Sequence, residues 1–182
     1  MSEHNFEQMR RAMVASQLRT TGVNDPRVLA AMGSVPRERF VPPERAPIAY
    51  ADALVPLGEG RQLNSPMALG KLLTEAAPQP GERAMVIGAA TGYAAAVLAR
   101  LVGSVVAVEE DAALAARAKA ALAGSGVTVI EGPLVEGYKQ GAPYDLILID
   151  GAVEHVPGTL IDQLAEGGRL ASGVVEQGVQ RL

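Results

Sequence analysis

The stretch AMVIGAATGY at residues 84–93 decides the fold of this chain. Its first four residues are apolar and run into a glycine, a pattern typical of a buried parallel strand. The alanine-rich run 94–101 that follows predicts a helix. Gly88 and Gly92 lie in the turn between them, where missing side chains allow positive φ and close approach of the backbone. Because such a turn presents free backbone N–H groups at a helix N-terminus, we expect a ligand site here.

A second predicted strand, 104–108, ends in two acids and indicates which ligand the turn binds. Glu109 follows Gly88 by about twenty residues, the spacing at which an acid meets the ribose of a bound nucleotide. Glycines in α/β connections also serve packing alone, so the acid is what favours a nucleoside cofactor. Ala90 replaces the middle glycine of the dinucleotide fingerprint, which disfavours NAD and favours S-adenosylmethionine, a cofactor without a pyrophosphate. The cofactor-binding candidates on these segments are Gly88, Ala89, Ala90, Thr91, Gly92, Glu109 and Glu110.

Length and composition limit the classes of protein to which this chain can belong. The chain has 182 residues, of which 48% are hydrophobic and 20% charged, as expected for one globular domain. No apolar run is long enough to span a membrane, and the first eleven residues are too polar for a signal peptide. The chain contains no cysteine, which excludes disulfides and thiolate metal sites and makes the cytoplasm the expected compartment. A net charge of −4 and 3% aromatic residues disfavour nucleic acid as a partner.

Strand and helix patterns alternate from residue 84 onward. Strands are predicted over 84–87, 105–108, 127–130, 146–149 and 170–174, and helices over 94–101, 112–123 and 159–164. This alternation predicts an α/β fold with a doubly wound, mainly parallel sheet. Ligands in such sheets bind outside the carboxyl ends of the strands. The residues predicted to converge there are Gly88, Glu109, Gly132 and Asp150.

The segment before the sheet is predicted to contain helices over 5–18, 27–32 and 67–76, the second ended by Gly33. A proline-rich connector covers 35–43. Residues 54–66 are predicted to form an irregular loop, and a loop of that length in a compact domain is usually functional or mobile.

Blocks of residues at 18–19, 22–23, 25–29, 35–38, 40–42, 49–50, 56–58, 92–93, 95–99, 144–145, 163–164 and 167–170 occur in a characteristic order. With these blocks, the chain resembles the protein-L-isoaspartate O-methyltransferase family over nearly its whole length. The resemblance implies an S-adenosylmethionine-dependent methyltransferase (Rossmann-like) fold with an N-terminal helical extension. It divides a single domain, 1–182, into N-terminal helices and substrate loop (1–80) and a cofactor-binding core (81–182).

The activity that the resemblance implies is methyl transfer from S-adenosylmethionine to the free carboxylate of L-isoaspartyl residues in damaged proteins or peptides. Such a protein-repair enzyme would act as a monomer or homodimer, without nucleic acid or membrane. A carboxylate with a pKa near 4 is already ionised at neutral pH, so no general base is required. Catalysis then reduces to holding oxygen, methyl carbon and sulfur in line.

Residues of the implied substrate loop differ from the family pattern. Asn64 stands where the resemblance implies a substrate-contacting serine, and it can still donate a hydrogen bond. The resemblance points to Asn64 and Asp52 as catalytic candidates and to Gln62, Leu63 and Ser65 as substrate-binding candidates. Two interpretations of Asp52 stay open, since it either lines the substrate loop or only caps a turn.

The implied cofactor site departs from the pattern as well. Val86 replaces an acid and Ala90 a glycine, and Gly132-Pro133 replaces a Gly-Asp pair whose acid would accept from the adenine amino group. Each lost polar contact costs roughly 0.5–1.5 kcal/mol, so two or three weaken cofactor binding roughly 10- to 1000-fold. Gly132 and Pro133 remain cofactor-binding candidates, and a catalytically silent homologue acting as a binding module is the alternative from another class.

Asp150, at the end of a predicted strand, leaves a second enzyme open. Metal-dependent small-molecule O-methyltransferases place a metal ligand at such a position, although a lone carboxylate is more often a hydrogen-bond acceptor. His155 in the next loop is close enough to face the same crevice, but without a matching ligand set it is expected to be a surface histidine. The family continues into further strands beyond residue 182, so strand 170–174 is expected to be an open edge.

Overall fold

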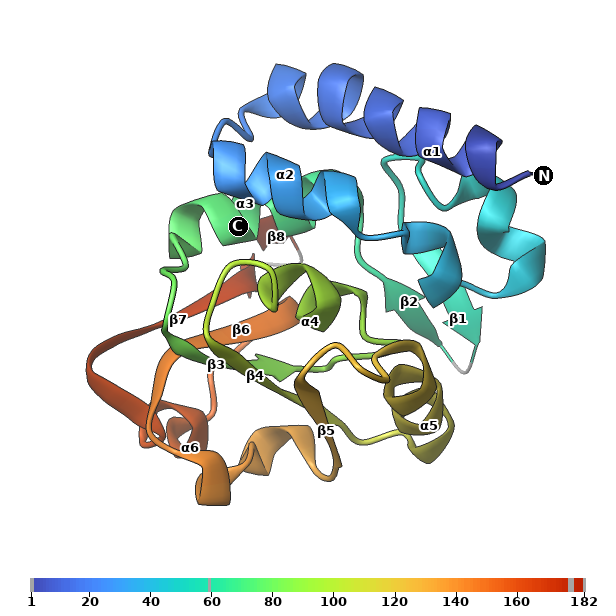
Figure 1. Ribbon diagram of the computed structural model, residues 1–182. Coiled ribbons are helices and arrows are strands. Elements are labelled where there is room, and N and C mark those ends of the chain that lie inside the picture. Colours follow the sequence, from blue (N-terminus) through green and yellow to red (C-terminus); the bar gives the residue numbers. More distant parts are fainter. Residues whose placement is uncertain (1, 59, 177–178, 182) are drawn as a thin grey trace.

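The computed structural model describes residues 2–58, 60–176 and 179–181 and contains a six-stranded sheet, whose arrangement can be followed in Figure 1. The strand order is β5-β4-β3-β6-β7-β8, with every neighbouring pair parallel except β7 and β8. The strands are β3 (Arg83–Ile87), β4 (Ser104–Glu109), β5 (Val127–Glu131), β6 (Tyr144–Val153), β7 (Leu164–Glu176) and β8 (Val179–Arg181). The prediction of a doubly wound, mainly parallel sheet is confirmed.

Helices cover one face of the sheet, and shorter elements cover the other (Figure 1). The first face carries α3 (Pro66–Ala76), α4 (Tyr93–Leu98) and α5 (Ala112–Ala121). The second carries α6 (Gly158–Ile161) and the 3₁₀ turns Leu134–Glu136 and Lys139–Gly141. All three predicted core helices form, each shorter than its predicted range.

The central strands are buried on both faces. Along β3, Ala84 and Val86 belong to one apolar cluster, and Met85 and Ile87 belong to the other. This is the period of two that a strand imposes on its side chains. The larger cluster also takes in side chains from the N-terminal segment, including Met13, Leu18 and Val28. Val86 is fully buried in it, so an apolar side chain stands where the family resemblance implies an acid.

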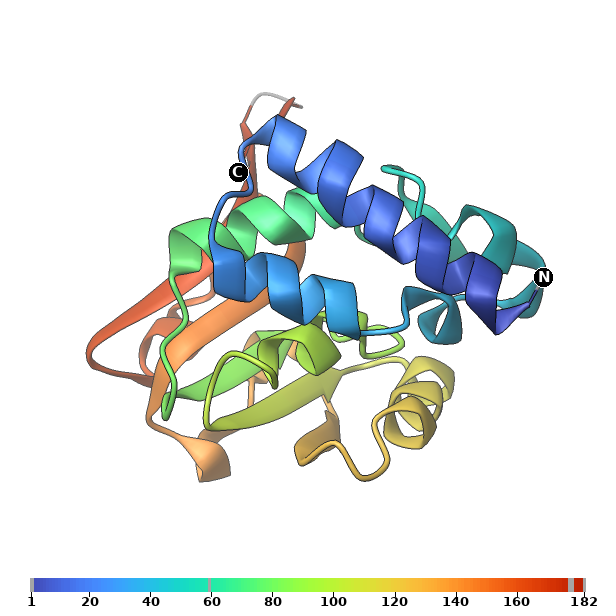
Figure 2. The same ribbon diagram turned by 45° about the horizontal axis from the view of Figure 1, so that its top comes forward.

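The N-terminal helices lie over α3 and α4 (Figures 1 and 2). They are α1 (Glu3–Ala12), which continues as a π-helix (Met13–Leu18), and α2 (Pro26–Ser34). Asp25 caps α2, its Oδ1 accepting from the Arg27 N–H at 2.8 Å. The prediction that Gly33 ends this helix is wrong. It ends at Ser34 because Val35 precedes a proline and is therefore extended.

Residues 54–66 are more regular than predicted, which corrects the expectation of an irregular loop. They contain an antiparallel hairpin of β1 (Val55–Gly58) and β2 (Arg61–Leu63). Val55, Leu57 and Leu63 are buried, so their side chains anchor the hairpin to the core. The sequence alternates too briefly for this to be visible as a strand pattern.

The far edge of β7 is partly paired. β8 runs antiparallel to it from Val174 to Glu176, so the expected open edge of strand 170–174 is wrong at Val174. Among the residues that the structure describes, none belongs to a helix long and apolar enough to cross a membrane.

Candidate functional site

A cavity of about 440 Å³ opens at the carboxyl ends of β3 and β6. Its size is within the range of small-molecule and cofactor sites. The apolar part of its wall includes Ile87, Ile149, Leu134 and Val135. The polar residues of the wall are Arg61, Gln62, Glu110, Asp150 and His155, and Gly88 also lines the cavity. The predicted convergence of strand ends on one crevice therefore brings Gly88 and Asp150 together.

The two glycines of the turn after β3 serve different purposes. Gly88 has φ +74° and lines the cavity, and a Cβ added to it would meet only Leu134 Cδ1, at 3.9 Å. A Cβ at Gly92 would lie 2.7 Å from Leu122 Cδ1, so this glycine is required for packing. Ala90 between them has φ +50°, a left-handed conformation that favours glycine. Gly88 is thus the point of this turn at which a ligand can approach the backbone closely.

The remaining turn candidates are buried. Ala89 is fully buried, and its N–H donates to the Val108 carbonyl at 3.0 Å. Thr91 is 2% exposed, and its hydroxyl donates to the Phe40 carbonyl at 2.5 Å. Both residues therefore support the conformation of the turn through buried hydrogen bonds.

Glu109, at the end of β4, is fully buried and satisfied by four donors. The two Nη atoms of Arg61 donate to its two carboxylate oxygens, each at 2.8 Å. The N–H of Ala90 donates to Oε2 at 2.6 Å and that of Asp111 to Oε1 at 3.0 Å. The acid is therefore turned toward the glycine turn, but Arg61 already holds both of its oxygens.

Asp150 is less well satisfied. Asn64 Nδ2 donates to its Oδ1 at 3.3 Å, which is a long contact. Burial raises the pKa of Asp150 from 3.8 to about 6, against the opposing effects of this hydrogen bond and of the Arg37 charge. The register between β6 and β7 shifts between Leu148 and Ala152. Such an irregularity re-aims side chains near active sites, and this one contains Asp150.

Arg37 fixes the loop that carries Asn64. It is fully buried, its Nη2 donates to the Asn64 carbonyl at 2.6 Å and its Nε to the Ala49 carbonyl at 2.6 Å. Its guanidinium carbon lies 4.7 Å from the centre of the Tyr93 ring, a cation–π contact. Burial lowers the pKa of Arg37, while Tyr93 and Asp150 act in the opposite direction. Arg37 thus places a buried positive charge behind the Asn64–Asp150 contact.

The other loop candidates divide between the cavity and helix α3. Gln62 lines the cavity, whereas Leu63 is 1% exposed and packs in the core. Ser65 caps α3, its Oγ accepting from the Ala68 N–H at 3.3 Å. Asp52 is exposed and accepts from the Met67 N–H at 2.9 Å, in the first turn of the same helix. Asp52 and Ser65 therefore stabilise the helix N-terminus and do not belong to the described cavity wall.

The remaining cofactor candidates lie around the cavity rim. Glu110 is exposed and lines the cavity. The Gly132 N–H donates to the Glu109 carbonyl at 3.0 Å, and Pro133 is exposed at the start of a 3₁₀ turn. The next residues of that turn, Leu134 and Val135, form part of the cavity wall.

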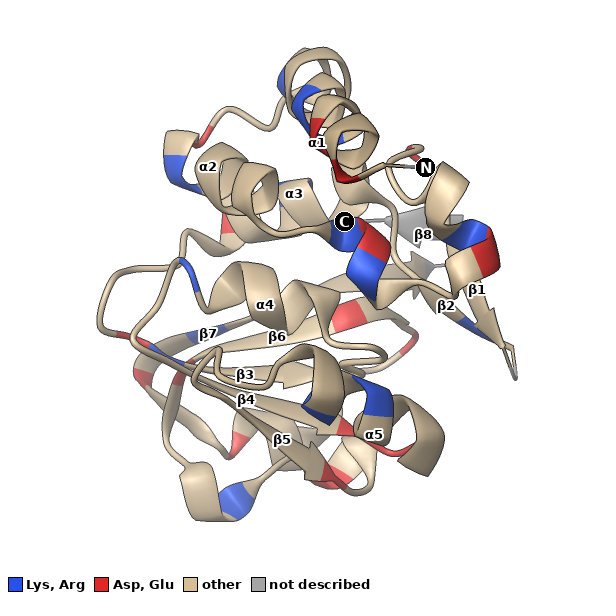
Figure 3. Cartoon of the chain, turned by 45° about the vertical axis from the view of Figure 1, so that its right-hand side comes forward, with Lys and Arg blue, Asp and Glu red and all other residues tan. Residues whose placement is uncertain are grey.

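Sequence reasoning missed Arg61, Leu134 and Val135. Arg61 lies directly before the predicted substrate-loop residues, and a single cation between Gly60 and Gln62 was a usable signal. Leu134 and Val135 carried no signal, because apolar residues after a strand usually pack in the core. Within the described ranges, no three His, Cys, Asp or Glu side chains form a group that could hold a metal ion. Basic and acidic residues are interspersed over the elements, as α1 illustrates in Figure 3.

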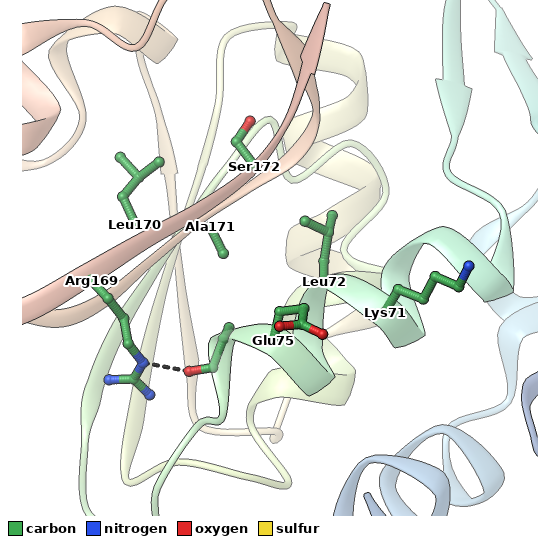
Figure 4. A pocket seen from close by; sticks show the side chains of 8 residues that line it. Lys71, Leu72, Glu75, Arg169, Leu170, Ala171 and Ser172 are labelled. Carbon is green, nitrogen blue, oxygen red and sulfur yellow. Dashed lines mark hydrogen bonds between the residues drawn. The ribbon is translucent and has the colours of Figure 1, made fainter. Parts of the chain in front are cut away.

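A second, smaller cavity of about 230 Å³ lies between α3 and β7 and shares no lining residue with the first (Figure 4). Arg169 reaches from β7 to the end of α3, where its Nε donates to the Ala76 carbonyl. The same guanidinium pairs with Glu82 at 2.8 and 2.9 Å. Arg169 thus joins α3, β7 and the segment before β3.

Comparisons with known proteins agree with this geometry. The family profile for protein-L-isoaspartate(D-aspartate) O-methyltransferase matches residues 9–182. A protein-L-isoaspartate O-methyltransferase of Rhodopseudomonas palustris is 43% identical over 98% of this chain and 74% of its own length. A relative of the same name from Methanoregula boonei is 44% identical over 94% of this chain and 80% of its own length.

Solved structures show the same fold. A protein-L-isoaspartate O-methyltransferase superposes with a TM-score of 0.80 and 28% identity, over 91% of this chain but 55% of its own. The crystal structure of a Plasmodium falciparum protein assigned to this family, with bound S-adenosyl-L-homocysteine, gives a TM-score of 0.81 at 20% identity over 94% of this chain and 86% of its own. From the family profile and the close relatives, we conclude that this chain belongs to the protein-L-isoaspartate(D-aspartate) O-methyltransferase family.

Proposed function

We propose that this protein transfers the methyl group of S-adenosylmethionine to the free carboxylate of L-isoaspartyl residues in damaged proteins or peptides. The observation that carries the proposal is the single cavity shared by the Gly88 turn and the β1–β2 hairpin. One side of this cavity suits a nucleoside cofactor and the other suits a peptide acceptor. Relatives named for this activity match nearly the whole chain, which supports the same reaction here.

The residues around Gly88 fit S-adenosylmethionine. Gly88 leaves open space in front of the backbone, and Leu134, Val135 and Ile149 offer an apolar wall for a flat base. Glu109 is a carboxylate at the position expected for the ribose hydroxyls. Pro133 has no polar side chain, so the adenine amino group is held by shape rather than by an acid.

The acceptor side is formed by the β1–β2 hairpin and the end of β6. Gln62 lines the cavity and offers an amide to a peptide backbone or carboxylate. Asn64 acts from behind by holding Asp150, and Arg37 holds the loop that carries Asn64. When bound, S-adenosylmethionine supplies an activated methyl group. The residues of the site then orient one carboxylate oxygen toward that group and exclude water, which is a positioning task.

The experiment has two steps. Titration with S-adenosyl-L-homocysteine by calorimetry measures binding to the cofactor side, and an isoaspartyl peptide with methyl-labelled cofactor then measures ester formation. Binding followed by ester formation supports the proposal, with the matching aspartyl peptide as the control. Absence of binding at millimolar ligand would instead indicate a catalytically silent binding module. Methylation confined to a catechol with added magnesium would indicate the metal-dependent alternative.

A further inference from the structure

The strongest polar contact in the site joins the two halves of the cavity. Arg61 begins strand β2 of the substrate hairpin, and Glu109 ends strand β4 of the cofactor core. Their bidentate pair has two N–O distances of 2.8 Å. The Glu109 side chain is fully buried and that of Arg61 is 26% exposed. Pairs of this kind are strong and directional because the guanidinium fork matches the carboxylate.

This pair blocks the proposed ribose contact. Among the described residues that line the cavity, Arg61 is present and the buried Glu109 is not, and both Glu109 oxygens already accept from the Arg61 guanidinium. The two N–H groups of Ala90 and Asp111 hold the acid from the protein side. Ribose hydroxyls can therefore reach Glu109 only if Arg61 moves away.

The same cavity needs a cation for its acceptor. The charged groups on its described wall are Arg61 on β2, Glu110 after β4 and Asp150 on β6, with His155 in the loop after β6. An isoaspartyl carboxylate entering this cavity meets two acids, and like charges disfavour its binding. Arg61 supplies the guanidinium cation on that wall, and it lies next to Gln62 in the β1–β2 hairpin.

We propose that Arg61 exchanges partners during the reaction, from Glu109 in the free protein to the carboxylate of the isoaspartyl acceptor once the cofactor ribose occupies Glu109. The inference rests on the proposed function. It makes Arg61 an acceptor-positioning residue: the guanidinium holds one carboxylate oxygen and leaves the other free to attack the methyl carbon. It also predicts ordered binding, with cofactor before acceptor, because Arg61 is released only when the cofactor binds.

Binding of S-adenosyl-L-homocysteine to Arg61→Gln tests the first half. The ligand no longer competes with a guanidinium, so we expect its dissociation constant to fall roughly tenfold. Arg61→Lys keeps the charge but loses the fork, and a smaller change in the same direction is expected. Arg61→Lys also keeps the test valid if Arg61→Gln does not fold. Arg100→Gln is the matched control, because it removes an exposed arginine outside this cavity and leaves the pair intact.

Steady-state kinetics with an isoaspartyl peptide tests the second half. We expect Arg61→Gln to raise KM for the peptide at least roughly tenfold while kcat changes less than about threefold. Product inhibition of the wild-type protein is expected to follow the pattern of ordered binding. Tighter cofactor binding combined with weaker peptide binding is a result that general loss of structure does not produce.

Two results would overturn the inference while leaving the proposed function intact. One is weaker binding of S-adenosyl-L-homocysteine by both Arg61 variants, and the other is an unchanged KM for the peptide in Arg61→Gln. If the wild-type protein binds no S-adenosyl-L-homocysteine, the proposed function and this inference fall together.

Discussion

Two carboxylates lie on the strands that flank the central strand β3, and they differ in how well hydrogen-bond donors surround them. Glu109 ends β4 on one side and is fully buried with four donors around it. Asp150 lies on β6 on the other side, and its described side-chain hydrogen bond is a 3.3 Å contact from Asn64. Burial raises the pKa of Asp150 to about 6. The first acid has hydrogen-bond donors for both of its oxygens, and the second is poorly supported in its ionised form.

The difference shows which of the two carboxylates destabilises the folded protein. A buried ion pair repays its desolvation only when its remaining lone pairs are satisfied, as they are at Glu109. Among the described residues, Asp150 has only the Asn64 side chain as a donor, so its charge destabilises the folded protein at neutral pH. The Glu109 carboxylate is thus fully hydrogen-bonded in the free protein, whereas the Asp150 carboxylate is an unfavourable charge close to Gly88. Cross-strand partners Ile87 and Ile149 bring the two positions together.

The largest expected effect on stability comes from replacing Glu109, the carboxylate that four donors surround. Glu109→Gln removes a charge that four donors surround and leaves Arg61 without its partner. We expect the free energy of unfolding to fall by about 2–4 kcal/mol, since removing one member of a buried pair is strongly destabilising. Urea denaturation followed by circular dichroism measures this.

Glu110→Gln is the matched control for this change. It makes the same chemical substitution one residue further on, where the side chain is exposed, and should alter stability by less than about 0.5 kcal/mol. Equal losses in the two variants would show that the Arg61–Glu109 pair contributes nothing special.

The opposite sign is expected on the other side of β3. The pKa of Asp150 is about 6 in the folded protein and 3.8 ordinarily, so between these values the folded state binds more protons than the unfolded state. Stability due to this group is therefore complete below pH ~4 and is lost as pH rises to ~6. Asp150→Asn removes the titration and should stabilise the protein at pH ~7.5 by up to about 3 kcal/mol.

The pH dependence distinguishes this cause from general effects of the substitution. The gain from Asp150→Asn should shrink steadily as the denaturation is repeated at lower pH toward ~4. Asp162→Asn, at an exposed position after α6, should show no such trend. A gain that is the same at every pH would contradict the assignment.

The sheet and the Glu109 side were accessible from sequence because both depend on local patterns. A four-residue apolar run, a glycine turn and an acid at a fixed spacing predicted β3, the turn and Glu109 correctly in position. The hairpin was not predicted, because Val55, Leu57 and Leu63 become a strand pattern only when buried against the core.

The hydrogen-bond partners of the site residues could not be predicted from the sequence, because these contacts join segments that are far apart along the chain. Arg61 lies 48 residues before Glu109, and Asn64 lies 86 residues before Asp150. Asp52 shows the converse. Its place beside the substrate loop favoured a catalytic role, whereas its carboxylate accepts from Met67 at the start of α3. A polar side chain near a site and one within it look alike until the backbone direction is known.

A smaller effect is expected from removing the Asn64 amide, which donates a hydrogen bond to Asp150. Asn64→Ala deletes the 3.3 Å donor, so the ionised form loses support and the pKa of Asp150 should rise further. We expect a rise of about 0.5–1 pH unit, because a hydrogen bond of this kind contributes roughly 1 kcal/mol. Carbon-detected NMR of the labelled carboxyl group follows the titration directly. Ser65→Ala, which removes the cap of α3 at a similar cost of about 1 kcal/mol, should leave it unchanged.

The smallest effect concerns the turn that supports Glu109. Ala90 donates its N–H to Glu109 while holding φ at +50°, so the acid is satisfied at the cost of a strained residue. Ala90→Gly relieves that strain but makes the unfolded chain more flexible, and the net gain should be about 0.5–1 kcal/mol. Ala77→Gly, where φ is +45° at the end of α3, should give a similar gain far from the site. Thermal denaturation compares the two. If Ala90→Gly instead loses stability, the alanine is holding the N–H in place for Glu109, and the fixed arrangement of the Glu109 carboxylate extends from the ion pair into the turn itself.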